Sequence, residues 1–164
     1  MADRELDRTD EWAALREQYL VVSGDRAPSS ARGLHHLALI SSNVERTIAF
    51  YQGVLEFPCT ELFENRDYRG STHFFFDIGN GNLLAFFDFP GLDLGTYGEL
   101  LGGLHHIAIS VAPDRWDHLR AKLEAEGVET QHVSGSSLYF RGPDGERLEL
   151  IKDDLGEMYG TIVA

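Results

Sequence analysis

Two adjacent histidines occur twice in this chain, in almost the same sequence context. The first pair is His35 and His36, in Gly-Leu-His-His-Leu-Ala-Leu from residue 33, and the second is His105 and His106, in Gly-Leu-His-His-Ile-Ala-Ile from residue 103. A lone histidine at the start of a strand is usually a partly exposed sheet residue, but a repeat at a fixed offset indicates a duplicated structural unit. Equivalent histidines in two related strands can converge across a pseudo-twofold axis, and imidazole is a common metal ligand. The repeat therefore predicts half of a metal site.

The sequence after the first histidine pair predicts a βαβββ module. The apolar run that begins with the pair predicts a strand at 34–41, and Asn43 is placed to cap the helix that follows. The apolar positions of that helix continue to Leu55, and Gly53 lies near its end. Three further strands are expected at 57–63, 72–78 and 82–89, with a tight turn at Gly79-Asn-Gly-Asn between the last two.

The second module repeats this order. A strand at 104–111 precedes a helix at about 113–126, which places Trp116 and Leu123 on its inner face. Gly127 is typical of the residue that ends a helix. Three strands are then expected at 128–134, 137–141 and 147–152, the last two joined by Gly142-Pro-Asp-Gly.

Composition limits the classes of function. The chain has 164 residues, enough for one domain with a substantial core. Its formal net charge of −13 disfavours binding to nucleic acid or to an anionic membrane, because like charges repel. The single cysteine, Cys59, allows no internal disulfide and suits a reducing compartment. No apolar stretch approaches the roughly 20 residues that span a bilayer, and the acidic N-terminus lacks the basic start of a signal peptide. We therefore expect a cytoplasmic protein.

The segments outside the repeat form an arm and a tail. Thr9 or Asp10 could cap a helix that runs to about Val22, and a polar Gly/Pro/Ser-rich linker follows it. We expect this arm to pack on the domain or on a partner subunit, although a frayed terminus is the alternative. The predicted organisation is an N-terminal arm at 1–32, a single domain at 33–152 with modules at 33–90 and 103–152, and a C-terminal tail at 153–164.

Beside the histidine motifs, the chain contains Thr-Ile-Ala-Phe-Tyr at 47–51 and Tyr-Phe-Arg-Gly-Pro-Asp-Gly-Glu-Arg-Leu-Glu at 139–149. With these segments, residues 33–152 resemble the vicinal oxygen chelate superfamily, which includes glyoxalase I, extradiol ring-cleaving dioxygenases, fosfomycin-resistance proteins and bleomycin-binding proteins. The resemblance implies an α+β fold in which two βαβββ modules form a cup-shaped half-barrel. It does not imply one activity, because this fold carries many chemistries.

The resemblance also implies a metal site. The second histidine of each pair falls on a ligand position of the superfamily, which gives His36 and His106, and the ligand of the final strand falls on Glu149. Glyoxalase I supplies a carboxylate from both modules, but the residue of this chain that matches Glu149 in the first module is Ala85. Two histidines and one carboxylate with open positions favour Fe(II), with Mn(II) as the alternative. No site for an organic cofactor is expected.

Three further residues are candidates for catalysis. Tyr139 falls where ring-cleaving dioxygenases carry a tyrosine beside the metal, and a phenol there can donate a hydrogen bond to an oxygen of the substrate. His35 matches a histidine of hydroquinone-type dioxygenases, but strand alternation would turn it away from its neighbour unless the strand end twists. His73 is a candidate acid or base if the odd-numbered face of its strand, which carries Phe75, lines the cup. Leu92 stands where catechol-cleaving enzymes carry an acid/base histidine, which weakens the case for ordinary catechol cleavage.

The leading expectation is an Fe(II)-dependent extradiol-type dioxygenase that acts with O2 on a small aromatic diol. The alternatives are a glyoxalase-like lyase or isomerase, a fosfomycin-resistance-like transferase, and a protein that binds a drug or natural product without catalysis. Superfamily members commonly pair, so we also expect a homodimer.

Overall fold

The structure is a computed structural model that describes residues 7–163. The first six residues of the predicted arm and the last residue of the predicted tail lie outside the described residues. The chain divides into two compact units, of which one ends at Arg32 and the other comprises Gly33–Val163. Within the described residues, no helix combines the length and the apolar character needed to cross a bilayer.

The first unit contains two helical segments, α1 (Thr9–Tyr19) and the 3₁₀ helix η1 (Ser23–Asp25). The prediction that Thr9 or Asp10 caps the first helix was wrong. Arg8 stands at the N-cap, and Asp7 accepts hydrogen bonds from the backbone N–H and the hydroxyl of Thr9 at 3.0 and 2.7 Å. An aspartate side chain that accepts a hydrogen bond from the backbone N–H two residues later closes a turn of its own. The turn that Asp7 forms in this way lies directly before the helix. The helix also ends earlier than the expected Val22.

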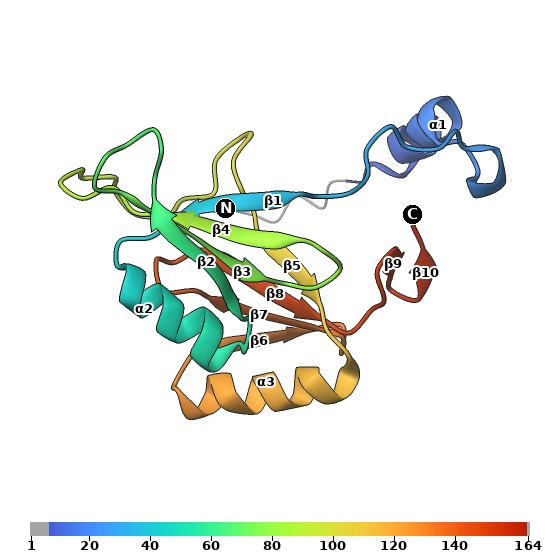
Figure 1. Ribbon diagram of the computed structural model, residues 1–164. Coiled ribbons are helices and arrows are strands. Elements are labelled where there is room, and N and C mark those ends of the chain that lie inside the picture. Colours follow the sequence, from blue (N-terminus) through green and yellow to red (C-terminus); the bar gives the residue numbers. More distant parts are fainter. Residues whose placement is uncertain (1–6, 164) are drawn as a thin grey trace. The chain divides into compact units, whose positions relative to one another are not determined.

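The second unit contains two four-stranded sheets with the same strand order (Figure 1). The first sheet has the order β1-β4-β3-β2, with β1 (His36–Ile40), β2 (Cys59–Glu64), β3 (Thr72–Asp77) and β4 (Leu83–Phe87). The second has the order β5-β8-β7-β6, with β5 (Ile107–Ser110), β6 (Thr130–Val133), β7 (Ser137–Arg141) and β8 (Arg147–Ile151). In each sheet the first strand pairs in parallel with the fourth, and the other neighbours are antiparallel. The predicted α+β fold of two βαβββ modules is confirmed.

Each module has its helix where the sequence predicts one. The first helix is α2 (Val44–Ile48), which continues as the π-helical segment η2 (Ala49–Val54), and the second is α3 (Pro113–Ala125). Asn43 is the predicted N-cap, and its side chain accepts a hydrogen bond from the backbone N–H of Arg46 at 2.8 Å. Gly127 follows α3 with a φ of 71°, a left-handed conformation that glycine adopts without strain.

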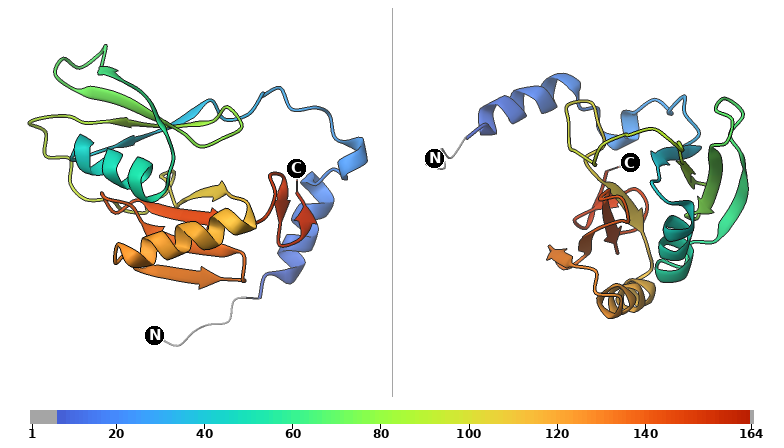
Figure 2. Two further views of the ribbon diagram at one scale, coloured as in Figure 1. Left: turned by 60° about the horizontal axis from the view of Figure 1, so that its bottom comes forward. Right: turned by 90° about the vertical axis from the view of Figure 1, so that its left-hand side faces the viewer.

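The helices of the two modules, α2 with η2 and α3, lie against the sheets (Figures 1 and 2). Together with one face of each sheet they form a single hydrophobic core. The first module contributes mainly aromatic rings, including Tyr51, Phe74, Phe76 and Phe86, all of them fully or almost fully buried. The second contributes Trp116, Leu119 and Leu123 of α3, together with Leu148 and Leu150 of β8. Because successive strand residues point to opposite faces, these core positions fix which side chains lie on the other face of each sheet.

A buried polar contact joins the two modules. The hydroxyl of Tyr51, on η2, donates to Oε1 of Glu146, in the turn before β8, at 2.7 Å, and Tyr51 is fully buried. Burial raises the pKa of the Glu146 carboxyl. At the edge of the same junction, Arg46 donates to Asp144 at 2.6 Å.

A strained residue follows the helix of the first module, two positions after the end of η2. Glu56 has a φ of 59°, which is uncommon for a residue with a side chain. Its carboxylate is held by three side chains of α3, those of Arg115, His118 and Lys122, with distances of 2.9 Å to His118 and to Lys122. The hydrogen bond to His118, followed by those to Lys122 and Arg115, lowers the pKa of Glu56 to about 2. The helix end therefore forms a second link between the modules.

The C-terminal residues form an element that the sequence did not predict. After β8, β9 (Glu157–Met158) and β10 (Thr161–Ile162) pair as a small antiparallel hairpin. Ser110 of β5 donates to the backbone carbonyl of Asp153 at 2.6 Å, which ties the start of this segment to the second sheet.

Candidate metal centre

The open face of the second sheet brings three of the predicted site residues together. Glu149 is the partner of Tyr139 in the pairing of β7 with β8, so the two side chains are neighbours on one face. His106 directly precedes β5, and its Nε2 lies 3.1 Å from Oε2 of Glu149. The rings of His106 and Tyr139 meet edge to face, with 5.5 Å between their centroids. We call His106, Tyr139 and Glu149 the second-module site.

Burial makes Glu149 the unusual member of this group. It is 4% exposed, and its neighbours Leu148 and Leu150 point into the core on the other face of the strand. A buried carboxylate is stable only with hydrogen bonds or a cation. Burial, and then the hydrogen bond to Glu149, raises the pKa of Tyr139 to about 12, so the phenol keeps its proton at neutral pH. An imidazole nitrogen and a carboxylate oxygen at this separation form a donor set that fits a divalent cation.

The first histidine of each pair contacts the second. Nδ1 of His35 lies 2.8 Å from Nδ1 of His36, and Nδ1 of His105 lies 2.6 Å from Nδ1 of His106. Strand alternation does not separate His35 from His36, because β1 begins at His36 and His35 lies before the strand, which is the exception expected from the sequence for a strand end. The catalytic role of His35 stays a prediction. A partner on Nδ1 orients the ring and leaves Nε2 to face a metal.

The predicted first-module ligand, His36, lies on the open face of the first sheet. Its ring contacts Phe75 at a centroid distance of 6.2 Å. His73 is on the same face, because Phe74 and Phe76 occupy the core face of β3. This agrees with the alternative from the sequence in which the odd-numbered side chains of β3, His73 and Phe75, lie on the open face of the first sheet.

His73 lies within a group of aromatic rings. It stacks on Phe87 at 3.9 Å and approaches Phe75 at 4.2 Å, and Phe63 meets its edge at 5.3 Å. Burial, followed by the nearby charge of His36, lowers the pKa of His73, and its Nε2 is a buried atom with no hydrogen-bond partner. The direction of this shift favours the neutral imidazole, and the unpartnered Nε2 is available as a proton acceptor or donor.

The structure does not bring all three predicted ligands together within one chain. Residues 7–163 contain no group of three or more His, Cys, Asp or Glu side chains placed to hold one metal ion, so His36 does not join His106 and Glu149 in such a group. The pairing of the strands does support the predicted asymmetry between the modules. Ala38 is paired with Ala85 as Ala108 is paired with Glu149, so Ala85 occupies the place of the missing carboxylate.

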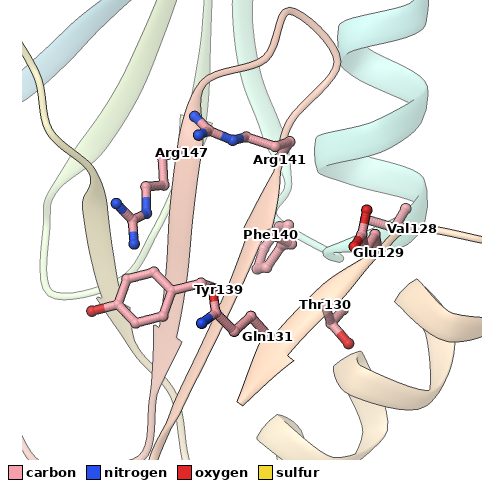
Figure 3. A pocket seen from close by; sticks show the side chains of 8 residues that line it. All are labelled: Val128, Glu129, Thr130, Gln131, Tyr139, Phe140, Arg141 and Arg147. Carbon is pink, nitrogen blue, oxygen red and sulfur yellow. The ribbon is translucent and has the colours of Figure 1, made fainter. Parts of the chain in front are cut away.

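Sequence reasoning missed two arginines beside the second-module site. Arg141 and Arg147 are directly opposite each other in the pairing of β7 with β8. Figure 3 shows their guanidinium groups and the phenol of Tyr139 pointing to the same side of these strands, with Gln131 next to the phenol. All four line an open cavity of about 490 Å³. The sequence shows one arginine on each side of the Gly-Pro-Asp-Gly turn, but Arg141 directly precedes the turn and Arg147 follows it after Glu146, so the spacing alone did not pair them. The register of β7 with β8 does.

A larger cavity, of about 1030 Å³, lies elsewhere in the domain. It is bounded by the end of β1, the connection at 88–97 and the turn at 143–146. None of the predicted site residues lines it.

Comparisons with known proteins identify the family to which this fold belongs. A family model described as the Glyoxalase/Bleomycin resistance protein/Dioxygenase superfamily matches residues 33–150. The chain belongs to this superfamily. Its members are generally metal-dependent enzymes that act on small molecules.

The similar proteins of this superfamily carry different activities. The chain is 30% identical to the metallothiol transferase FosB of Shouchella clausii (strain KSM-K16) over 133 residues, which cover 76% of this chain and 83% of FosB. It is 28% identical over 102 residues to the provisionally named ring-cleaving dioxygenase MhqE of Bacillus subtilis (strain 168), covering 60% of this chain but only a third of MhqE (33%). A crystal structure of a FosX variant from Listeria monocytogenes, complexed with Mn(II) and 1S,2S-dihydroxypropylphosphonic acid, is 25% identical with a TM-score of 0.57, over 76% of this chain and 95% of that one.

Proposed function

We propose that the protein is a metal-dependent dioxygenase that cleaves the ring of a small aromatic diol. The observation that carries the proposal is the place of Tyr139, whose protonated hydroxyl lies against Glu149 and beside the ring of His106. A phenol that stays protonated at neutral pH can donate a hydrogen bond to a substrate oxygen as negative charge develops there. The similarity to MhqE supports the same reaction class.

The proposed metal ligands are His36, His106 and Glu149. His106 and Glu149 already face each other, and the absence of a second carboxylate at Ala85 leaves a set of two imidazoles and one carboxylate. This set favours Fe(II), with Mn(II) as the alternative. Bound Fe(II) would supply the redox chemistry that O2 requires. The chain itself orients the imidazoles through the Nδ1 contacts and holds a proton on the hydroxyl of Tyr139.

We further propose that the working enzyme is a homodimer. Within one chain, His36 lies on the open face of the first sheet, apart from the second-module site. A second copy related by a twofold axis could bring its first-module face to the second-module site, and the symmetry would then create two equal sites. The aromatic face around His73 would supply an apolar wall that excludes water from the diol.

Metal content and oxygen uptake test this proposal. The protein is purified without oxygen, its metals are measured by elemental analysis, and O2 uptake is recorded with catechol and with hydroquinone as probes. We expect stoichiometric iron and O2 uptake with at least one diol. Protein that carries no divalent metal, or that is iron-loaded and consumes no O2 with any diol, would contradict the dioxygenase assignment.

A metal-dependent thiol transferase is the second candidate. The alignment with FosB favours it, because that protein matches over most of its own length whereas MhqE matches over a third. Such an enzyme needs no O2. Loss of a thiol in the presence of an epoxide under anaerobic conditions, without O2 uptake on diols in air, would select this candidate over the dioxygenase.

A further inference from the structure

Arg141 and Arg147 form an electrostatically unfavourable pair. They are directly opposite each other on adjacent antiparallel strands, where two like charges destabilise the sheet. The chain has only 14 lysines and arginines against 27 acidic residues, so two adjacent cations on one face are not a general property of its surface. A pair of this kind is stable when an anion neutralises it.

Glu99, in the connection between the modules, partly neutralises the two arginines. Oε1 of Glu99 lies 3.7 Å from Arg141 and 3.6 Å from Arg147. These separations are too long for the charge-assisted hydrogen bonds of about 2.7–2.9 Å that guanidinium and carboxylate groups make at full contact. The guanidinium groups therefore retain N–H donors that a free anion can use.

Contacts with neighbouring side chains hold the guanidinium of Arg147 in a position from which it can bind an anion. Its guanidinium lies over the ring of Tyr139, 4.8 Å from the centroid, and Nη1 donates to Nε2 of His105 at 3.3 Å. Arg141 lies over the ring of Tyr97 at 5.4 Å. A guanidinium fixed on an aromatic face loses little freedom when it binds a carboxylate. Both arginines line the cavity of about 490 Å³ that Tyr139 shares with them (Figure 3).

We propose that Arg141 and Arg147 anchor a carboxylate of the substrate, and that Glu99 occupies their anion position until the substrate displaces it. The substrate class is thereby narrowed to small molecules that carry an anionic oxygen group as well as the reacting part. This inference rests on the proposed function in one respect, because it assigns the anion to the substrate of the second-module site. Tyr139 belongs to both groups of residues, so a carboxylate held by the arginines lies beside the phenol.

Binding of benzoate to the metal-free protein tests the anchor without metal or turnover. The protein is treated with a chelator, and benzoate, its uncharged analogue benzamide, and phenylphosphonate are titrated by ligand-observed NMR or calorimetry. We expect benzoate to bind, benzamide to bind at least about tenfold more weakly, and the preference to shrink as salt is added. Because this measurement needs no iron and no O2, its failure is distinct from failure of the dioxygenase assignment.

Three variants with a matched control separate an anion site from a structural contact. R141Q and R147Q should each weaken the binding of benzoate by about tenfold or more. R69Q, at an exposed arginine in the loop before β3, should leave the affinity for benzoate unchanged. E99Q removes the competing carboxylate and should tighten benzoate about two- to fivefold. This gain cannot arise from misfolding.

Two results would overturn the proposal. If benzoate binds no better than benzamide and E99Q only lowers the thermal midpoint, then Glu99 is a structural clamp and the arginines hold the connection. If phenylphosphonate binds and benzoate does not, the site takes an anion but the assignment of a carboxylate is wrong.

Discussion

The burial of a single carboxylate, that of Glu149, determines the chemistry that the candidate metal centre can perform. Glu149 is the buried acid of β8, and the imidazole of His106 lies within ion-pair distance of its carboxylate, at 3.1 Å. A metal ion would satisfy that carboxylate more completely than an imidazole does, because it supplies a full positive charge at the same place. Both residues lie on rigid strands or at their ends, which fixes their separation before any ion binds.

Alanine variants of the ligands test this assignment. We expect H106A, E149A and H36A each to abolish most metal binding, as measured by competition with a chromogenic chelator. H105A should weaken it by about tenfold or more, because the residue orients His106 through Nδ1. H132A, at an exposed histidine on β6, is the control and should bind metal as the wild type does. Full metal retention in E149A would remove Glu149 from the ligand set.

The hydroxyl of Tyr139 can be removed with little change in shape. Y139F should keep the fold and the metal, since only one oxygen atom is lost. If the phenol acts as an acid towards the substrate, turnover should fall by about 10²–10⁴-fold. Y68F, in the exposed loop between β2 and β3, serves as the control. Unchanged turnover in Y139F with any accepted diol would return this tyrosine to a packing role and favour the transferase.

At the scale of elements, the end of η2 depends on charges supplied by α3. The left-handed conformation of Glu56 costs of order 1 kcal/mol for a residue with a side chain, and glycine would adopt it freely. The chain has a glutamate there because its carboxylate binds Arg115, His118 and Lys122. The carboxylate is partly exposed, so solvent screens much of this attraction.

This arrangement predicts a specific dependence of stability on pH. The pKa of Glu56 is lowered to about 2 in the folded protein from 4.5, so its contribution is complete above about pH 4.5 and is lost as the pH falls towards 2. The thermal midpoint of E56Q should therefore lie below that of the wild type at pH 7, and the gap should close in acid. A gap that stays constant from pH 7 to pH 3 would show that the charge of Glu56 contributes nothing. E56G, which relieves the backbone strain while losing the ion pairs, should fall between the two at pH 7.

In the whole molecule, the proposed metal ligands are divided between two half-sites. His36 forms the first, and His106 and Glu149 form the second. The core holds each sheet against its helix and leaves the faces that carry His36 and Glu149 apart. A dimer with shared sites would give a mass near twice 18.4 kDa by light scattering. If a copy supplies His36 to the Glu149 of its partner, two inactive variants can complement each other.

Mixing experiments test this sharing directly. H36A and E149A should each be inactive alone. After they are mixed and allowed to exchange subunits, half of the dimers are mixed, and each mixed dimer has one intact site, so activity should recover to about a quarter of the wild type. H106A mixed with E149A is the control and should stay inactive, because both changes affect the same half-site. A monodisperse monomer at micromolar concentration would exclude the dimer.

Local rules were enough to predict most of the fold from the sequence. The repeated histidine motif gave the duplication, the period of two in the strands placed Phe74 and Phe76 on the face opposite His73, and Asn43 and Gly127 marked helix ends. These inferences succeed because each depends on residues close together in the chain. The roles of the predicted ligands stay predictions, since their assignment came from the resemblance to the superfamily.

Only the tertiary structure determines which of the residues on the open faces of the two sheets come into contact. Sequence spacing can place His36, His106 and Glu149 on open faces, but the packing of the helices determines that only the last two approach each other in one chain. It also brings Glu99, from the connection between the modules, to the paired arginines of β7 and β8. Contacts of this kind depend on the relative positions of elements far apart in the chain, and those positions are set by the summed burial of many side chains.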